Sequence, residues 1–159
     1  MGVTTEGIVE VECTKGIGIH LIGLPDSAAK ESLLRVITAM ESAGYHCPGQ
    51  KIVIRVSLEG GPGRVDWSQF DLGIAIGILA ESGQIELEQR AYLNDFFTGQ
   101  LTLGGQVVAG NIGIYPIDAA RIMDYRNTAE DTYIYGWAED GLARWCGGTL
   151  GDIIEQVSR

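Results

Sequence analysis

Lysine is scarce in this sequence of 159 residues, which contains only Lys15, Lys30 and Lys51. Eleven basic residues stand against twenty-one acidic ones, so the formal net charge is −10. A chain with this charge repels a phosphate backbone as a whole, and nucleic acid would bind only through a local basic patch. Lys30 and Lys51 could form such a patch with Arg55 and Arg64, although the same residues also suit isolated charges on an acidic surface.

Long apolar runs and targeting signals are absent as well. The longest apolar run, Leu72–Ala80, is less than half of the roughly 20 residues that a membrane-spanning helix needs. Residues 1–6 lack the basic and apolar regions of a signal peptide. The three cysteines, Cys13, Cys47 and Cys146, are odd in number and widely spaced, which is typical of reduced thiols. We therefore expect a cytoplasmic protein that has no membrane partner.

Motifs for nucleotide or metal chemistry are incomplete. Gly44, Gly49 and Lys51 resemble the spacing of a P-loop, but Gln50 stands where the phosphate-binding lysine is needed, and apolar residues follow. The residues that could bind zinc are Cys13, His20, His46 and Cys47. These four lack the short, paired spacing that structural zinc sites usually show. We expect neither a cofactor nor a metal ion in this chain.

Acid–base catalysis would need two carboxyl groups at a defined separation. The candidates are Glu59, Asp66, Asp71 and Asp95. The sequence brings no two of them together, and Asp71 already has a structural role in the first turn of a predicted helix. The acidic surplus is interpreted as solvated surface.

Hydrophobic periodicity predicts the elements of the first third of the chain. Strands are expected at Ile8–Cys13 and Lys51–Leu58, each with one buried face. Ile17–Leu24 is predicted to be a strand that pairs antiparallel with the first, after a turn at Lys15 and Gly16. A helix should begin with Asp26 as N-cap and end at Gly44, with Glu31 and Arg35 as an i,i+4 ion pair. Its expected apolar face comprises Ala29, Leu33, Val36, Ile37 and Met40.

The remaining two thirds alternate between helical and strand patterns. Ser68–Asp71 is predicted to be a capping box that opens a buried helix over Leu72–Ala80. Pro116 suits the first turn of another helix, and Thr149–Asp152 is a second capping box before a C-terminal helix. Strands are expected at Ala91–Phe97, Gln100–Leu103, Val107–Asn111, Thr132–Tyr135 and Leu142–Trp145. The predicted fold class is therefore α+β, or mixed α/β.

A core can be predicted from the apolar faces of these elements. The positions expected to be buried are Leu33, Val36, Ile37, Met40, Ile54, Val56, Ile74, Ile78 and Ile153. Burial of each side chain should contribute about 1.5–3 kcal/mol.

The run Ile22–Ser32, which reads Ile-Gly-Leu-Pro-Asp-Ser-Ala-Ala-Lys-Glu-Ser, resembles a motif of magnesium-chelatase-like AAA+ ATPases of the ComM and YifB type. The resemblance extends over most of the chain, from about Gly7 to Val157. Further matching segments are Arg35–Tyr45, Pro48–Ile52, Phe70–Ala80, Gly99–Gly105, Tyr115–Ala120, Gly141–Leu142, Trp145 and Thr149–Ile154. The chain is similar to the N-terminal Lon-protease-like (ChlI-type) domain of that family.

The resemblance implies a fold and a set of partners. The implied fold is that of domain two of ribosomal protein S five, shared with the C-terminal domain of Lon protease. Residues 1–159 would form one such domain, without the AAA+ module, which the chain does not reach. The implied partners are an AAA+ ATPase module or homologous subunits, including a homo-oligomer, in a process linked to DNA recombination or transformation. The implied binding residues are Gly23, Leu24, Pro25, Asp26, Lys30, Glu31 and Arg55.

Two departures from the family pattern affect these expectations. The Gly-rich segment Glu59–Arg64 replaces a more charged loop of the family, and the chain ends where the family continues into its nucleotide-binding module. The chain could be an excised domain or a divergent stand-alone paralogue that acts as a protein-interaction module.

A Ser-Lys peptidase is the alternative that Lon proteins suggest. By resemblance, Gln69 takes the position of the Lon serine, and Ser68 is its neighbour. The strand expected to carry the lysine, within Gln106–Asn111, contains none, and no lysine follows Lys51. A serine without a base is not activated, so we expect no catalytic residue and a non-catalytic domain.

Overall fold

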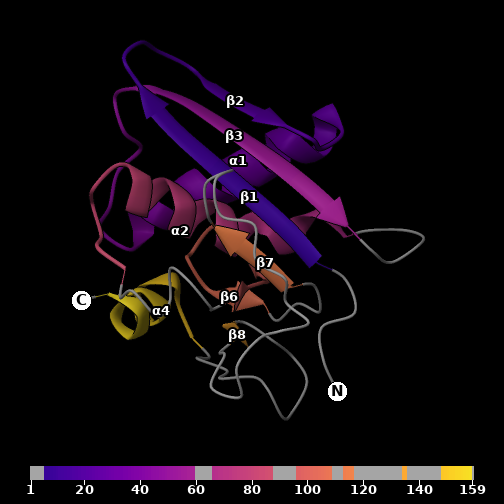
Figure 1. Cartoon of the computed structure of the whole chain (residues 1–159). Helices are drawn as coiled ribbons and strands as arrows, with labels where there is room; N and C mark the ends of the chain where they lie inside the picture. Colours follow the sequence, from indigo (N-terminus) through magenta and orange to yellow (C-terminus); the bar gives the residue numbers. More distant parts are fainter. Residues whose placement is uncertain are drawn as a thin grey trace.

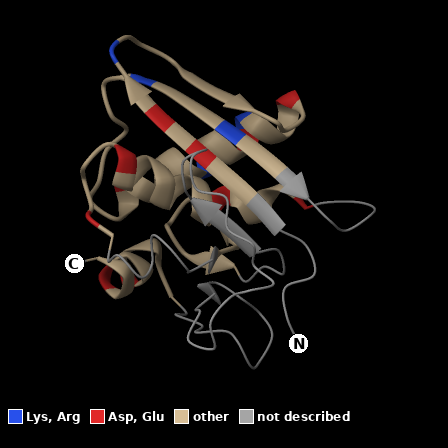
Figure 2. Cartoon of the chain, viewed as in Figure 1, with Lys and Arg blue, Asp and Glu red and all other residues tan. Residues whose placement is uncertain are grey.

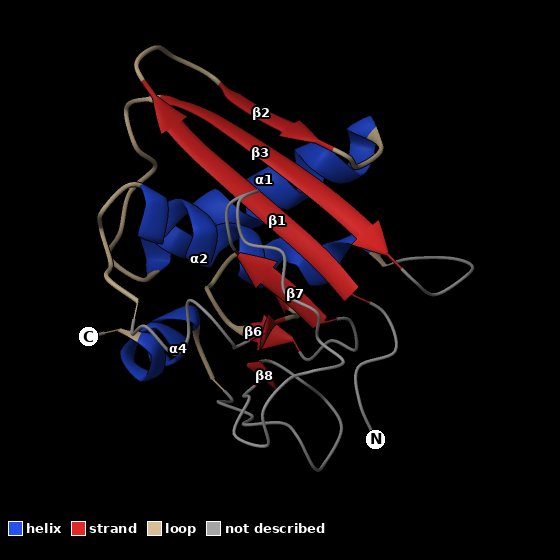
Figure 3. Ribbon diagram, in the orientation of Figure 1, coloured by secondary structure: helices blue, strands red, loops and turns tan. Residues whose placement is uncertain are grey.

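The computed structural model describes residues 6–59, 66–87, 96–108, 113–116, 134–135 and 148–158. These residues confirm the α+β class, because helices cover one face of a mixed sheet whose strands run in the order β2-β3-β1-β7-β4-β8 (Figures 1 and 3). A separate pair, β5 and β6, forms a small antiparallel sheet. The strands are β1 Glu6–Thr14, β2 Ile19–Ile22, β3 Lys51–Glu59, β4 Phe96–Phe97, β5 Gln100–Leu101, β6 Val107–Val108, β7 Gly113–Pro116 and β8 Ile134–Tyr135. The helices are α1 Asp26–Ser42, the 3-10 turn η1 Trp67–Phe70, α2 Asp71–Glu81 and α4 Leu150–Val157.

The two long strands, β1 and β3, form the centre of the sheet. They pair antiparallel over their whole length, from Glu6 opposite Glu59 to Thr14 opposite Lys51. Their alternating sequences place Val9, Val11, Ile52, Ile54 and Val56 in the core beneath the helices. Both predicted strands, and the face that each buries, are confirmed.

The predicted partner of β2 was wrong. β2 pairs parallel with β3, from Ile19 opposite Ile52 to Ile22 opposite Arg55, and does not touch β1 in the sheet order. Gly16 and Gly18 in the connection have positive φ angles of 136° and 99°, which lets the chain pass over the start of β3 instead of closing a hairpin. The Ile52 N–H then donates to the Gly18 carbonyl at 2.9 Å.

Helix α1 begins and ends close to the predicted positions. It starts at Asp26 itself, with Pro25 as N-cap and no side-chain cap, so the prediction of Asp26 as N-cap was one residue off. Gly44 lies just beyond the end with φ +91°, and the Gly44 and Tyr45 N–H groups donate to the Glu41 and Met40 carbonyls, as in a Schellman motif.

The buried face of α1 is rotated from the predicted one. Ser32, Val36, Ala39 and Met40 are buried, whereas Ile37 is only partly buried, which corrects its assignment to the core. Leu33 is partly buried against the core. The other positions predicted to be buried are confirmed: Val36, Met40, Ile54, Val56, Ile74, Ile78 and Ile153.

Helix α2 is buried along nearly its whole length, as predicted. Residues Asp71–Leu79 are all buried between α1 and the sheet. Its predicted capping box was wrong, because Asp66 accepts a hydrogen bond from the Ser68 N–H and opens η1, after which α2 begins at Asp71. A carboxylate two residues earlier therefore replaces Ser68 as the capping group.

The β5–β6 hairpin joins α2 to α4. Between the two predicted strands the chain turns at Leu103–Gln106, where the Thr102 N–H donates to the Gln106 carbonyl at 2.9 Å. The capping box at Thr149 and Asp152 is confirmed, and so is the buried stripe of α4, Leu150, Ile153, Ile154 and Val157. The Leu150 N–H donates to the Gly105 carbonyl at 2.7 Å, which attaches α4 to the hairpin.

Some predictions fall outside the described residues: the Gly-rich loop after Glu59, most of Ala91–Phe97, residues 109–111, the third helix beyond Pro116, and Leu142–Trp145. Pro116 itself ends β7, opposite Val9, rather than opening a helix. Proline has no N–H to continue the ladder of hydrogen bonds, so it ends the strand. None of the helices in the described segments has the length and apolar character that crossing a membrane requires.

Candidate functional site

An open groove of about 470 Å³ lies between the edge strand β2 and helix α1. The strand contributes all of its residues, Ile19–Ile22, and the start of β3 contributes Lys51 and Val53. The helix contributes Asp26, Ala29, Lys30 and Leu33. These four positions follow the spacing i, i+3, i+4, i+7, so they share the helix face that is turned towards the strand.

The first residues of the family motif, Gly23–Pro25, form the link between β2 and α1 and thereby determine how the two walls of the groove lie. Gly23 has φ +104°, and a Cβ there would collide with the backbone carbonyl oxygen of Val56. Leu24 is partly buried against the core, and Pro25 is the N-cap of α1. The link therefore fixes how closely the helix follows the strand, and Gly23 is needed because only glycine fits this approach.

The polar groups of the groove are exposed and mostly basic. Lys30 and Lys51 line it together with His20, and Asp26 is the acidic residue at the helix start. Of the predicted binding residues, the structure thus brings Asp26 and Lys30 into one groove. Sequence reasoning had grouped Lys51 with Lys30 but had not placed His20 beside them, because the parallel pairing of β2 with β3 is not visible in the sequence.

The remaining predicted residues lie outside the groove lining. Glu31 is exposed on α1. Arg55 alternates with buried residues of β3 and so lies on the outer face of the sheet, where its guanidinium is 3.7 Å from the Glu12 carboxylate. In Figure 2, acidic segments of β1 lie beside a basic segment of β3. The basic patch expected from Lys30, Lys51 and Arg55 is therefore divided, because Arg55 has an acidic partner on β1. Arg64 lies outside the described residues.

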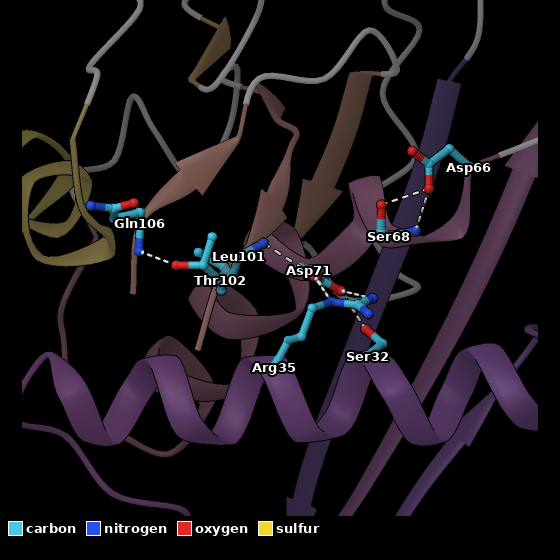
Figure 4. Close-up of polar contacts among 8 residues, drawn as sticks. All are labelled: Ser32, Arg35, Asp66, Ser68, Asp71, Leu101, Thr102 and Gln106. Carbon is cyan, nitrogen blue, oxygen red and sulfur yellow. Dashed lines mark hydrogen bonds and ion pairs between the residues drawn. The ribbon is translucent and has the colours of Figure 1, made fainter. Parts of the chain in front are cut away.

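A second polar cluster joins α1, α2 and the β5–β6 hairpin (Figure 4). The Asp71 carboxylate is fully buried and accepts hydrogen bonds from the Ser32 hydroxyl at 2.6 Å and the Leu101 N–H at 3.1 Å. Arg35 donates to both of its oxygens, at 2.6 and 3.2 Å. Arg35 therefore makes its ion pair with Asp71, and the predicted partner Glu31 contributes a smaller favourable charge, because the buried carboxylate attracts the guanidinium more strongly than an exposed one.

The electrostatics of this cluster point to a structural role. Burial raises the pKa of Asp71 above its usual range, and the hydrogen bonds from Arg35 and Ser32 oppose that shift. The hydrogen bond with Asp71 raises the pKa of Arg35 further. Donors from α1 and from the β5–β6 hairpin reach this carboxylate of α2, so it acts as a junction between elements. A signal for it existed in the sequence: Ser32 and Arg35 flank the apolar stripe of α1, and Asp71 precedes an entirely apolar helix.

Ser68, the candidate nucleophile of the peptidase alternative, faces a carboxylate. Its hydroxyl donates to Asp66 Oδ1 at 2.6 Å, and its N–H donates to the same oxygen at 3.1 Å (Figure 4). Lys30 and Lys51 line the groove beside β2 instead. Of the four carboxylates considered in the sequence, Asp66 thus caps a turn and Asp71 is buried, while the side chains of Glu59 and Asp95 lie outside the described residues.

The near-P-loop does not fit a nucleotide phosphate. A P-loop connects a strand to the N-terminus of a helix, where N–H groups point at the phosphates. Here Gly44 follows the C-terminus of α1 and Lys51 begins β3, so the order of the elements is reversed. In the described segments, no three His, Cys, Asp or Glu side chains are grouped to hold a metal ion.

The two described cysteines are free and partly buried. Burial raises the pKa of both thiols, and Glu81 adds to the effect at Cys13 as Glu41 does at Cys47. A raised pKa leaves less of the reactive thiolate at neutral pH. Neither thiol is therefore activated as a nucleophile. Cys146 lies outside the described residues.

Comparison with known proteins places residues 9–127 in the family described as subunit ChlI of Mg-chelatase. The competence protein ComM of Haemophilus influenzae is 36% identical over 110 residues, which cover 68% of this chain and 20% of the relative. The protein YifB of Escherichia coli is 35% identical over 99 residues, which cover 61% of this chain and 19% of YifB. An uncharacterized protein of Mycobacterium bovis is 32% identical over 100 residues, covering 62% of this chain and 19% of its own length. The chain thus spans about a fifth of the length of these relatives.

Proposed function

Because the chain belongs to the family of magnesium-chelatase subunit ChlI, with ComM and YifB among its relatives, we propose that it is a non-catalytic domain that binds a protein partner in the assembly of an AAA+ ATPase. The groove between β2 and α1 is the observation that supports this role. It combines an apolar floor with exposed charges, which is the composition of a binding surface.

The contacts of the polar residues argue against hydrolysis as the function. The Ser68 hydroxyl donates to Asp66, and Asp71 accepts hydrogen bonds from α1 and β5. A Ser-Lys peptidase needs its lysine within hydrogen-bond reach of the serine, and Lys30 and Lys51 line the groove instead. The relative ComM is named a competence protein, which agrees with the link to DNA recombination or transformation that the family resemblance implies. In our proposal the ATPase acts on DNA, and this acidic domain contacts protein.

Sedimentation velocity tests the proposal. The chain is mixed with the ComM-type AAA+ ATPase of its own organism, with and without magnesium-ATP. We expect the chain to sediment with the ATPase at micromolar concentrations. The variant Gly49→Ala, changed at an exposed loop position where a Cβ meets nothing within 4 Å, serves as a folded control. If the chain sediments alone under every condition, the proposed assembly function is wrong.

A further inference from the structure

Strand β2 is a short edge strand that has no lysine, proline or bulge of its own. Within the described residues it has a hydrogen-bonded neighbour, β3, on one side only. Natural edge strands are usually guarded by lysine, proline or a bulge. The segment from Ile17 to Ile22 contains none of these, and Ile17 and Ile22 are 90% and 53% exposed. An exposed apolar edge of this kind is suited to accept another strand.

The backbone of β2 is oriented to accept that strand. The Gly18 carbonyl accepts the Ile52 N–H, so it points towards β3. Backbone groups of successive residues in a strand point to opposite sides. The N–H and C=O groups of Ile19 and Leu21 therefore point to the free edge of a strand that also lines the groove.

Helix α1 forms the second wall beside this edge. Ala29 and Leu33 offer apolar surface, together with Ile19 and Leu21 of the strand. An edge strand that faces a helix across a groove is the geometry in which peptides add a strand to a sheet. The groove also contains two of the three lysines of a chain whose net charge is −10.

We propose that β2 and α1 bind an extended peptide segment that alternates apolar and acidic residues and adds as a new strand along β2. Its apolar side chains enter the groove between Leu21 and Leu33, and the exposed lysines at the groove, Lys30 and Lys51, attract its carboxylates. This inference rests on the proposed binding function, and it specifies the chemistry of the partner.

The probe is a synthetic octapeptide of alternating valine and glutamate, labelled with a fluorophore, and the measurement is fluorescence anisotropy. We expect saturable binding that weakens with added salt, because exposed ion pairs are screened. The double variant Lys30→Glu/Lys51→Glu should bind at least about tenfold more weakly, since two attractions become repulsions. Lys15→Glu makes one such charge reversal at a position that does not line the groove and should bind as the wild type does. Melting temperatures of all variants verify that they fold.

Backbone pairing is tested with two modified peptides, one N-methylated on its valines and the other on its glutamates. In a strand, the direction of the side chain and the direction of the N–H alternate together. One of the two peptides must therefore lose binding, while the other retains it. Equal binding of both, or equal loss in Lys15→Glu and in the double variant, overturns the inference. If the peptide fails to bind but the chain sediments with the ATPase, the edge-strand inference is wrong and the assembly function stands.

Discussion

Arg35 and Asp71 form the buried ion pair on which the junction of α1, α2 and the hairpin depends. The Arg35 side chain is 18% exposed and that of Asp71 is fully buried. Arg35→Met leaves the carboxylate without its charged partner, which should lower the free energy of unfolding by about 3 kcal/mol. Arg55→Met, at an exposed pair with Glu12, should cost less than about 1 kcal/mol. Urea unfolding of both variants checks this, and equal losses would contradict the assigned role of Arg35.

The raised pKa of Asp71 gives a pH dependence with a definite sign. Its folded pKa is higher than the unfolded one, so the folded state binds the proton more tightly. The stability linked to this group is therefore fully present below the usual aspartate range and is lost as pH rises through the raised folded pKa.

Asp71→Asn removes that titration. Wild type should therefore lose stability relative to Asp71→Asn as the pH rises from about 3.5 to about 7, measured by urea unfolding at several pH values. A constant difference across that range, or a gain for wild type, would show that burial does not dominate the pKa of Asp71.

At the scale of elements, Gly23 determines how α1 meets the sheet. Gly23→Ala places a side chain at φ +104° against the Val56 carbonyl and should cost about 2 kcal/mol or more. Gly49→Ala, where a Cβ would meet nothing within 4 Å, should change stability by less than about 0.5 kcal/mol. Thermal unfolding distinguishes the two. If Gly23→Ala is as stable as wild type, the link is not the constraint described above.

The elements also show which features a sequence can predict. Patterns that lie within one segment of the chain were predicted correctly. Alternation identified β1 and β3, helical periodicity identified α2, and the Thr149–Asp152 spacing identified the cap of α4. The partner of β2 was missed, because β2 pairs with a strand some thirty residues further along the chain. Arg35 was assigned a partner in its own helix, because its actual partner Asp71 lies 36 residues away in the sequence. The same limit applies to the groove. The family motif at its helix was visible in the sequence, but the position of β2 as the edge strand that forms the other wall was not.

At the scale of the whole molecule, the account predicts a chain without hydrolase activity and without affinity for nucleotide. Fluorescent casein should remain intact with or without magnesium-ATP, because Ser68 has an aspartate partner rather than a lysine base. Calorimetry should show no heat of binding for magnesium-ATP, because the near-P-loop has its elements in reversed order. Casein cleavage that Ser68→Ala abolishes, or a micromolar dissociation constant for the nucleotide, would contradict the non-catalytic role.

The central claim is that the domain works by binding a protein partner in the groove between β2 and α1. Nuclear magnetic resonance of the ¹⁵N-labelled chain tests it most directly, by following backbone amide shifts during titration with the ComM-type ATPase of the same organism. The account predicts that the largest changes occur at Ile19, Leu21 and Lys30 and that Lys30→Glu/Lys51→Glu suppresses them. Changes confined to α4 and the β5–β6 hairpin, with the groove amides unmoved, would contradict it.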